Sequence, residues 1–352
     1  MNKKPTQEEK TALSTIHNYI YGNWLTMVVY TFAELGIADI LEDKNASAEE
    51  LSRFTQTKQE ALIRFLRCAC DLQLIDFHLD TNSFSLSELG QFLRTNHPNS
   101  KRNLARLNGA SYRYNPWGNL VQILREGNGK KWSPTYEKGT LDYLSDKPQY
   151  LKMFQQAMNN ASEEENLPIA SSYDFSSYNH IVDVGGGTGN FLKTILRINP
   201  QLNGTIYDLK MTLEMAEYDN KTDINKRMKK EEGDFFEFVP DTGDIYLLKN
   251  VIHNWPEEKT LLLLENISLA MKSVKSNQTA VKDKKLLIIE NIIEEKKGVN
   301  VANWLDLNFM ILVDGKERSL LEYRKLVAHK GFMINRIIPT PTSRKILELS
   351  II

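Results

Sequence analysis

Cysteine is scarce in this sequence. Only Cys68 and Cys70 occur among 352 residues, which is too few for the disulfide framework of a small secreted protein. The two lie close together in a segment with a helical pattern, face different sides, and lack the second pair of ligands that a metal site needs. The polar start MNKKPTQEEK leads into no secretory signal pattern. We therefore expect a cytoplasmic protein without structural disulfides or a metal.

Net charge is also nearly absent. The chain carries 44 basic and 45 acidic residues, for a net charge of −1. Proteins that bind a phosphate backbone or an anionic membrane surface through charge need a basic excess. The composition therefore favours neither nucleic acid nor membrane as a partner.

Long, uniformly apolar runs are missing as well. Residues 11–33 contain no Asp, Glu, Lys or Arg, but they include Ser14, His17, Asn18 and Asn23, whereas a membrane span needs about 20 predominantly apolar residues. We expect this stretch to form a helix that is buried in a core or against a second subunit. The second possibility indicates a homodimer.

The first part of the chain has helical patterns and one hairpin pattern. Residues 46–54, with Ser47 and Glu50 placed as a capping box, and residues 59–74 are predicted helices. Residues 77–86 are a predicted hairpin. Helix, helix and hairpin in this order are typical of a winged helix, a fold often associated with DNA. Residues 58–74 contain only three basic side chains, so dimerisation is the better interpretation.

After about residue 178, short β-rich runs alternate with helical stretches. A helical pattern precedes them at 143–165, and a Lys-rich surface loop is expected at 272–285. The alternation predicts an α/β fold with a parallel sheet that is covered by helices on both faces. Ligands of such sheets bind at the carboxyl ends of the strands. The predicted strands are 181–184, 205–207, 244–248, 285–292, 332–337 and 345–352.

A glycine-rich loop follows the first of these strands. The segment IVDVGGGTGNF, residues 181–191, has glycine at four of the five positions 185–189. Its spacing is neither the dinucleotide pattern nor a P-loop, but such a loop lets a ligand lie directly on the backbone. The next strand ends at Asp208, where an acidic side chain can bind a ribose diol. Together they indicate a nucleoside-type cofactor.

Further motifs narrow the choice of cofactor. The chain contains GDFFEFVP at 233–240, DIYLLKNVIHNWPEE at 244–258, LLIIENII at 286–293 and GKERSLLEYRKLVAHKGF at 315–332, with MFQQAM at 153–158. With the glycine loop, these motifs resemble those of the small-molecule O-methyltransferases that use S-adenosylmethionine, both the plant caffeate and hydroxyindole type and the bacterial natural-product type. The resemblance implies a Rossmann-like class I methyltransferase sheet with a winged-helix-like N-terminal dimerisation domain.

The resemblance also implies roles for individual residues. Those expected at the cofactor are Gly185, Asp208 for the ribose hydroxyls, Asp234 and Phe235 flanking the adenine, and Lys249. His253 is the expected catalytic base, with Glu290 and Glu317 beside it. The expected acceptor-binding residues are Phe154, Met158, Asn303 and Phe309, although a core role fits the apolar side chains of Phe154, Met158 and Phe309 equally well from pattern alone. Two positions depart from the family pattern: Asn254 replaces an Asp, and Lys210 replaces a proline.

The residue types suit the chemistry independently of the resemblance. A phenol has a pKa near 10, so it needs a base at neutral pH, and neutral histidine can accept its proton. A carboxylate on the other ring nitrogen fixes the tautomer and stabilises the imidazolium. Glu290 lies within an apolar strand pattern, where a charge is costly unless it is paired or functional.

We therefore expect an O-methyltransferase that acts on a hydroxyl of a small aromatic or polyketide-like metabolite. Its expected parts are a dimerisation domain at 1–100, a helical connector contributing to the substrate pocket at 101–177, and a catalytic domain at 178–352. Two alternatives stay open at this point. One is a relative that catalyses N- or C-methylation, decarboxylation or a pericyclic reaction, and the other is a winged-helix regulator that senses the cofactor.

Overall fold

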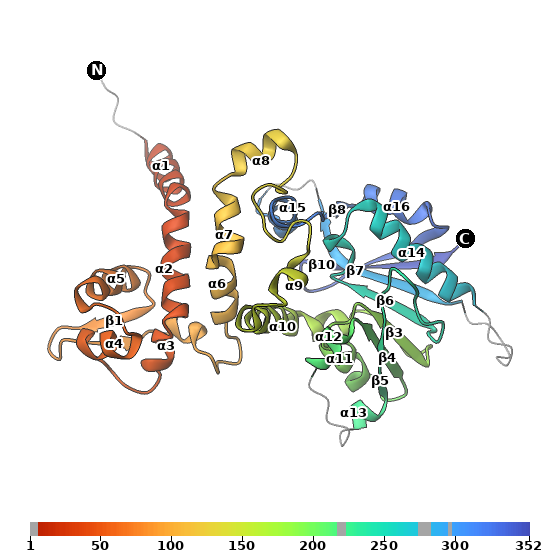
Figure 1. Ribbon diagram of the computed structural model, residues 1–352, viewed down its shortest axis with the longest axis horizontal. Helices are drawn as coiled ribbons and strands as arrows, with labels where there is room; N and C mark the ends of the chain where they lie inside the picture. Colours follow the sequence, from red (N-terminus) through yellow and green to blue (C-terminus); the bar gives the residue numbers. More distant parts are fainter. Residues whose placement is uncertain (1–5, 217–222, 274–282, 295–297) are drawn as a thin grey trace. The chain divides into compact units, whose positions relative to one another are not determined.

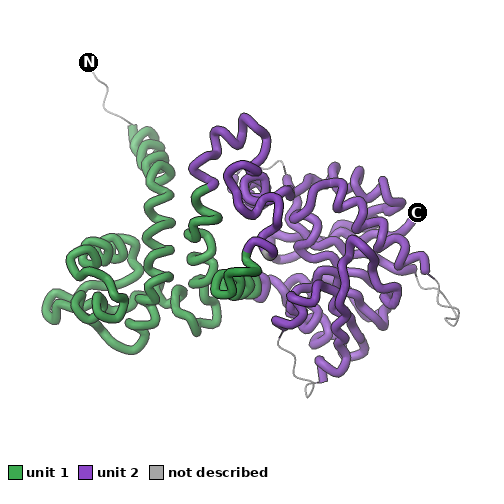
Figure 2. Tube along the Cα trace, viewed as in Figure 1, with its two compact units in different colours: residues 1–115, 144–161 green, residues 116–143, 162–352 purple. Residues whose placement is uncertain are grey.

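The structure, a computed structural model, describes residues 6–216, 223–273, 283–294 and 298–352. Within it the chain forms two compact units (Figure 2). Unit 1 comprises residues 1–115 and 144–161, and unit 2 comprises residues 116–143 and 162–352. Three helices, α7 (Ser111–Trp117), α9 (Thr140–Leu144) and α10 (Pro148–Ala170), contain residues of both units.

Unit 1 is helical apart from one hairpin. The predicted order of helix, helix and hairpin is confirmed by α4, α5 and the antiparallel pair β1 and β2. Ser47 and Glu50 form the expected capping box at the start of α4, because each accepts a hydrogen bond from the other's backbone N–H. The elements are α1 (Gln7–Ile20), α2 (Gly22–Glu34), α3 (Ile37–Ile40), α4 (Ala48–Thr55), α5 (Gln59–Asp71), β1 (Ile75–His78), β2 (Ser83–Leu86), η1 (Gly90–Leu93) and α6 (Arg102–Gly109).

The uncharged stretch at 11–33 forms two helices, so the prediction of one helix is wrong. Helix α1 ends before Tyr21 and α2 begins at Gly22, a residue with low helix propensity. None of the residues of α1, all of which the structure describes, is buried, and α2 buries only Phe32 and Ala33. The described helices include none that is long and apolar enough to cross a membrane.

Unit 2 is built around a mixed sheet. Its elements are α8 (Leu120–Glu126), α9 (Thr140–Leu144), β3 (His180–Val184), α11 (Asn190–Ile198), β4 (Asn203–Asp208), α12 (Lys210–Glu214), α13 (Asp223–Lys226), β5 (Met228–Glu232), β6 (Ile245–Lys249), η2 (Ile252–Asn254), α14 (Glu257–Lys272), β7 (Lys285–Ile293), α15 (Val301–Leu312), β8 (Arg318–Ser319), α16 (Leu320–Ala328), β9 (Phe332–Pro339) and β10 (Arg344–Ile351). The described strands lie in the order β5-β4-β3-β6-β7-β10-β9, and β8 pairs with β7.

The prediction of a fully parallel sheet is wrong at one strand. Strands β5, β4, β3, β6 and β7 are parallel, whereas β10 is antiparallel to both β7 and β9. The short connection between β9 and β10 allows a hairpin but is too short for the crossover that a parallel pair requires. Two strands were not predicted: β5, whose sequence MKKEE is charged because it lies at the sheet edge, and the two-residue β8. Most of the predicted loop at 272–285 lies outside the described residues.

Helices cover both faces of this sheet, as expected (Figure 1). One core lies between the sheet and the pair α14 and α16, with Leu263, Ile267 and Tyr323 fully buried. The other lies between the sheet and α11 together with the end of α10, where Ile169 and Leu192 are fully buried. The two cores hold the carboxyl ends of β3, β4 and β6 in fixed positions, and the candidate site lies at those ends.

Candidate active site

The glycine loop leaves β3 through a backbone conformation that favours glycine. Gly185 has a φ of +67°, and its N–H donates to the Tyr207 carbonyl at 2.8 Å. A Cβ at this position would come within 3.0 Å of Val251 Cγ2 and 3.4 Å of Phe235 Cε1. Side chains rarely adopt such a φ, so a residue other than glycine would strain the loop and crowd the Phe235 ring.

Asp208, at the end of β4, is tied to that loop. One carboxylate oxygen accepts the Gly187 N–H at 2.8 Å, and the other accepts the Leu209 N–H at 2.8 Å. Burial raises the pKa of Asp208, and these two backbone hydrogen bonds oppose the rise. The first residue after Leu209 begins α12, so Lys210 stands at a helix position where proline is also well tolerated.

The segment after β5 brings two further predicted residues to the same place. The Gly233 N–H donates to the Asp208 carbonyl at 3.1 Å, so the next residues lie beside the end of β4. Asp234 accepts the Phe236 N–H at 2.8 Å, and the Phe235 carbonyl accepts the Asn266 side-chain amide at 3.0 Å. The structure thus brings Gly185, Asp208, Asp234 and Phe235 together at adjacent strand ends.

Lys249 ends β6 and lies beside a buried carboxylate. Its Nζ donates to Ser162 Oγ at 2.5 Å and lies 5.2 Å from the centre of the Phe191 ring. Burial lowers the pKa of Lys249 to about 8, and the charge of Arg344 acts in the same direction. Burial raises the pKa of Asp183 to about 7, opposed by the charge of Lys249.

Asp183 offers a test of whether a ligand fits this loop. Its Oδ2 is buried and has no hydrogen-bond partner in the described part of the chain, although buried polar atoms are normally paired. A Cβ on Gly186 would lie 2.8 Å from this same atom. The unpaired Asp183 oxygen, the bare glycine backbone and the Asp208 carboxylate fit a nucleoside cofactor that lies across the loop.

His253 lies on η2, directly after β6, and is held by a fully buried carboxylate. Its Nδ1 is 2.6 Å from Glu290 Oε2, and Glu290 Oε1 accepts the Ile252 N–H at 3.1 Å. Glu290 therefore fixes both the imidazole ring and the backbone that carries it. The Phe309 ring stacks on the imidazole, with 4.6 Å between ring centres and 24° between planes.

Glu317 is the more distant of the two predicted glutamates. Its Oε1 is 3.8 Å from His253 Nδ1, too far for a hydrogen bond, and accepts the Asn291 amide at 3.4 Å. Burial raises the pKa of Glu317 to about 7, and the nearby His253 opposes this. Burial acts to lower the pKa of His253, but the charge and hydrogen bond of Glu290, with the charge of Glu317, raise it overall.

Sequence reasoning missed two residues that shape this cluster. Gly315 lies directly on the backbone of η2, because a Cβ there would be 2.1 Å from the His253 carbonyl oxygen. Arg318 is almost fully buried and donates to the Ile252 and Trp255 carbonyls, both at 3.4 Å. Both lie in the motif that begins GKERS, but only the fold shows that they clamp the loop carrying His253.

The three side chains His253, Glu290 and Glu317 also have the spacing of a possible metal cluster, since their ligand atoms lie within 4.8 Å of one another. Nδ1, the ring nitrogen that faces both carboxylates, is however already in a 2.6 Å hydrogen bond with Glu290. An ion at this position would have to replace that bond. The geometry therefore favours a hydrogen-bonded base over a metal ligand set.

The predicted acceptor-binding residues are spread over the two units. Phe309 contacts the imidazole of His253, and Asn303 is exposed on the same helix, α15. Phe154 and Met158 belong to the part of α10 in unit 1, where Phe154 is half-buried and Met158 is exposed. Asn254, the departure from the family pattern, donates from its amide to the Asn250 carbonyl at 3.0 Å.

Comparison with known proteins agrees with this geometry. Residues 117–333 match the O-methyltransferase domain, and residues 17–96 match the O-methyltransferase dimerisation domain. Over 339 residues, covering 95% of each chain, the sequence is 29% identical to the phenazine O-methyltransferase PhzM of Lysobacter antibioticus.

Solved structures extend the likeness over the whole chain. The mitomycin 7-O-methyltransferase MmcR is 28% identical with a TM-score of 0.87, covering 99% of this chain and 100% of that one. NcsB1, an O-methyltransferase solved with S-adenosylmethionine and 2-hydroxy-5-methyl naphthoic acid, is 25% identical with a TM-score of 0.77, covering 93% and 96%. The chain therefore belongs to the S-adenosylmethionine-dependent O-methyltransferases of the natural-product type.

Proposed function

We propose that this enzyme methylates a hydroxyl of a small aromatic or polyketide-like metabolite, with His253 as the general base. The observation that carries the proposal is the 2.6 Å hydrogen bond between His253 Nδ1 and the fully buried Glu290. An ionised carboxylate only accepts hydrogen bonds, so Nδ1 carries the proton and Nε2 keeps its lone pair. Nε2 makes no hydrogen bond to any residue that the structure describes.

The proton transfer follows from that tautomer. The acceptor hydroxyl gives its proton to Nε2 while its oxygen bonds to the methyl carbon. The bond from that carbon to the sulfonium sulfur breaks, its electron pair stays on sulfur, which leaves as a thioether, and the imidazole becomes an imidazolium. Glu290 stabilises the new positive charge through the Nδ1 hydrogen bond, as the carboxylate does in a serine-protease triad. Glu317 adds a second negative charge nearby. Phe309 stacks on the ring and limits its rotation.

S-adenosylmethionine supplies a methyl group already activated by its sulfonium. The enzyme then needs alignment more than activation. In this proposal Gly185 lets the cofactor lie on the backbone, and Asp208 accepts hydrogen bonds from the ribose hydroxyls. Asp234 and Phe235 flank the adenine, and Lys249 lies beside the cofactor. Phe154, Met158, Asn303 and Phe309 are the proposed acceptor-binding residues. The aromatic acid in the NcsB1 complex supports a flat, oxygenated acceptor.

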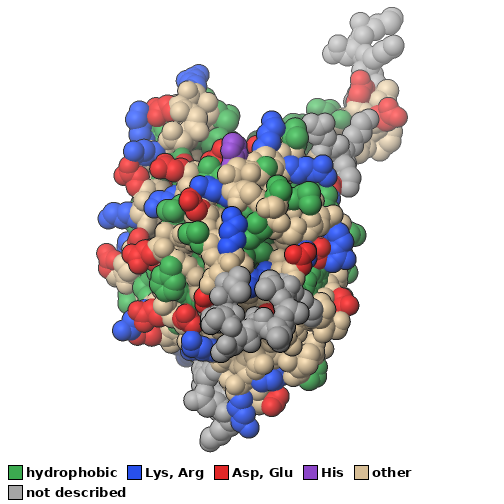
Figure 3. Space-filling model, turned by 90° about the vertical axis from the view of Figure 1, so that its right-hand side faces the viewer, with side chains coloured by type: hydrophobic (Ala, Val, Ile, Leu, Met, Phe, Trp, Pro, Cys, Tyr) green, Lys and Arg blue, Asp and Glu red, His purple; other side chains and the backbone are tan. Residues whose placement is uncertain are grey.

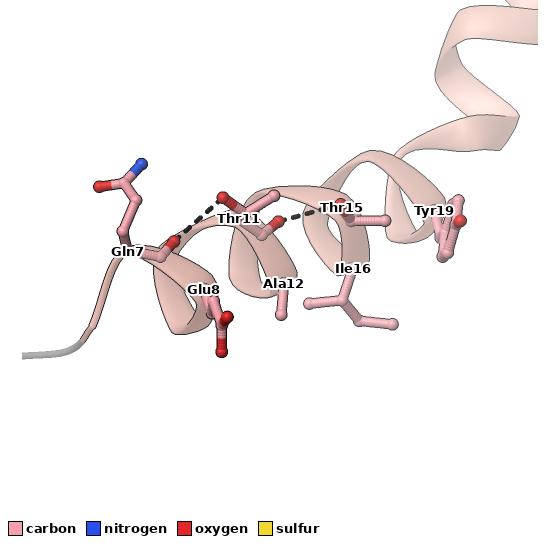
Figure 4. A pocket seen from close by; sticks show the side chains of 7 residues that line it. All are labelled: Gln7, Glu8, Thr11, Ala12, Thr15, Ile16 and Tyr19. Atoms are coloured by element: carbon pink, nitrogen blue, oxygen red, sulfur yellow. Dashed lines mark hydrogen bonds between the residues drawn. The ribbon is translucent and has the colours of Figure 1, made fainter.

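We also propose a homodimer that forms through α1. The exposed apolar side chains of this helix, the turn after it and the start of α2 include Leu13, Ile16, Tyr19, Ile20, Tyr21 and Trp24. Residues 17–96 match a dimerisation domain. A shallow groove runs along the helix (Figure 4), and its threonines Thr11 and Thr15 already bond to carbonyls of the same helix. Such an apolar surface is typical of an interface.

Light scattering tests the dimer. Replacing Ile16 and Tyr19 by Glu should halve the measured mass, because charges would then face the partner's apolar side chains. Asn18→Glu, on the opposite side of α1, is the matched control and should stay dimeric. A wild-type monomer, or a dimer that survives the double substitution, would contradict this interface.

The regulator alternative predicts DNA binding, which the charge distribution does not support. Figure 3 shows Lys and Arg interspersed with Asp and Glu on the face in view, without a continuous basic patch. A gel shift with random DNA at low salt should show no complex. A stable complex would favour the regulator.

The proposed reaction is tested with methyl-labelled S-adenosylmethionine and a panel of phenols that includes 3-amino-4-hydroxybenzoate and hydroxynaphthoic acids. We expect label in an O-methyl product, identified by mass spectrometry, with wild type, and a large loss with His253→Gln. Label on nitrogen or carbon, or conversion of an acceptor without label, would replace this proposal with one of the other reactions that use the same cofactor site.

A further inference from the structure

The loop that carries His253 contains a residue in an unusual backbone conformation. Asn250, between β6 and η2, has a φ of +59°, a left-handed conformation that asparagine adopts more readily than most residues but still at some cost. Its N–H donates to the Ile289 carbonyl of β7 at 3.2 Å. The chain therefore turns sharply just before the base, and something must hold that turn.

Two side chains hold the turn. The Nε of Arg344 donates to Asn250 Oδ1 at 2.7 Å, and the amide of Asn254 donates to the Asn250 carbonyl at 3.0 Å. The first contact crosses from β10, and the second closes the loop on itself around His253. Together they fix both the side chain and the backbone of Asn250.

Arg344 is itself held in place. It is the first residue of β10 and pairs across the sheet with Asn291, the residue after Glu290. Its guanidinium forms an ion pair with Glu165 of α10, and only 15% of its side chain is exposed. A planar, multiply bonded guanidinium loses little further entropy on holding Asn250. Arg344 thus presents a fixed positive charge behind the base loop.

The hydrogen bond that Asn254 donates explains why Asn stands where the family pattern has Asp. An amide can donate to the Asn250 carbonyl, whereas an aspartate carboxylate would place an acceptor against an acceptor. The Asn at this position is therefore matched to the left-handed turn at Asn250.

We propose that Arg344, acting with Asn254 through Asn250, is a positioning residue that holds the loop carrying His253 and places a positive charge behind it. The inference rests on the proposed role of His253. It adds a cation from β10 to the cluster formed by His253 and its two carboxylates.

The charged and titratable groups around His253 come from several elements. Glu290 of β7 and Glu317, just before β8, raise the pKa of His253, whereas Arg344 of β10 lowers it. Tyr323 of α16 lies near both glutamates, Lys249 of β6 lies near Glu290, and Asp306 of α15 accepts the Glu317 N–H at 3.0 Å. Arg318, the residue after Glu317, donates to the Ile252 carbonyl, and Glu165 of α10 pairs with Arg344. The charge of Arg344 opposes that of the two carboxylates at the imidazole. Removing its charge should let the base protonate at higher pH.

Nuclear magnetic resonance of protein with ¹³C-labelled histidine rings tests this without an acceptor. The chain has six histidines, and the His253 signal is the one that disappears in His253→Gln. In Arg344→Gln its titration midpoint should rise by about half a pH unit or more, since a nearby like charge has been removed. Arg344→Lys should restore most of the wild-type midpoint. The matched control is Lys345→Gln, whose lysine pairs with Glu294 rather than His253, and it should change nothing.

An unchanged His253 midpoint in Arg344→Gln would overturn the proposal. If Arg344→Gln does not fold, Asn250→Gly decides instead. Glycine adopts the left-handed conformation freely but cannot bind Arg344, so the guanidinium is released from the loop towards Glu165. The His253 midpoint should then shift upward, and an unchanged midpoint would count against the role. Asn254→Asp should lower turnover at least severalfold, while the cofactor affinity measured by calorimetry stays unchanged. Unchanged turnover would show that Asn254 does not help to position the His253 loop. Shifted midpoints without methyl transfer to any phenol would retain the Arg344 role and refute the proposed reaction alone.

Discussion

The cofactor end of the site and the base cluster are built in different ways. Gly185, Asp208 and Asp234 lie at the ends of adjacent parallel strands. Backbone hydrogen bonds join these strand ends, and the loop can pack closely because glycine has no side chain. His253 and Glu290 are buried and come from elements 37 residues apart that meet side chain to side chain. In the proposed function the first arrangement binds the cofactor and the second performs the chemistry, so changes in the two should separate cofactor affinity from turnover.

The largest effect is expected at the base. His253→Gln keeps the size of the side chain and some hydrogen bonding but removes the proton acceptor, so turnover should fall by roughly 10² to 10⁴. Cofactor affinity in calorimetry should stay as in wild type, because the proposed cofactor residues lie elsewhere. A comparable loss of cofactor affinity in His253→Gln would contradict the separation between a region that binds the cofactor and a region that performs the chemistry.

The second-largest effect is expected at Gly315, which contacts the backbone that carries His253. Gly315→Ala places a Cβ 2.1 Å from the His253 carbonyl, so the backbone must move and turnover should fall by roughly 10². Gly22→Ala is the control, because a Cβ there meets nothing within 4 Å. Thermal unfolding of both variants, with calorimetry of cofactor binding, distinguishes local displacement of the base from general loss of fold.

The two glutamates should differ. Glu290→Gln removes a charge-assisted hydrogen bond worth about 1.5 to 3 kcal/mol, so turnover should fall by roughly 10- to 150-fold. Glu317→Gln should cost less, because its oxygen is 3.8 Å from Nδ1. Since the pKa of Glu317 is about 7, its carboxyl is protonated below that pH, and the defect of the Gln variant should appear mainly above it. Equal losses at all pH values would contradict these separate roles.

The smallest effect on chemistry is expected at the cofactor end. Asp208→Ala should weaken S-adenosylmethionine binding by about 1.5 to 3 kcal/mol, through loss of an ionic acceptor for the ribose hydroxyls. Turnover at saturating cofactor should change little. Asp208→Asn is the companion variant that keeps the side-chain size, and unchanged affinity in the Ala variant would remove Asp208 from the cofactor site.

The difference between local strand-end features and contacts across the chain also decides which residues could be predicted from the sequence. The glycine loop, Asp208 and the motif around His253 are local patterns, because the backbone requirements of a strand end act over a few residues. Gly315, Arg318 and Arg344 could not be assigned, since their partners lie far away in the chain and their importance comes from one close approach each.

Some secondary-structure elements could not be predicted from the sequence for similar reasons. Strand β5 is charged because it lies at an edge, β8 is too short to produce a pattern, and the direction of β10 depends on a short connection. The break at Tyr21 was missed because an uncharged run gave no sign of where one helix ends and the next begins. Whether Phe154 and Met158 bind the acceptor stays a prediction.

The most direct test of the central claim is the pH dependence of kcat/KM with one phenol, measured for wild type and His253→Gln. The carboxylates raise the pKa of His253 above its ordinary value of about 6.5, and only the neutral ring is a base. Wild-type kcat/KM should therefore fall as the pH drops through a pKa above that value. In His253→Gln this step should be absent, and the residual rate should rise with pH towards the pKa of the phenol itself. The same step in both enzymes would show that another group is the base.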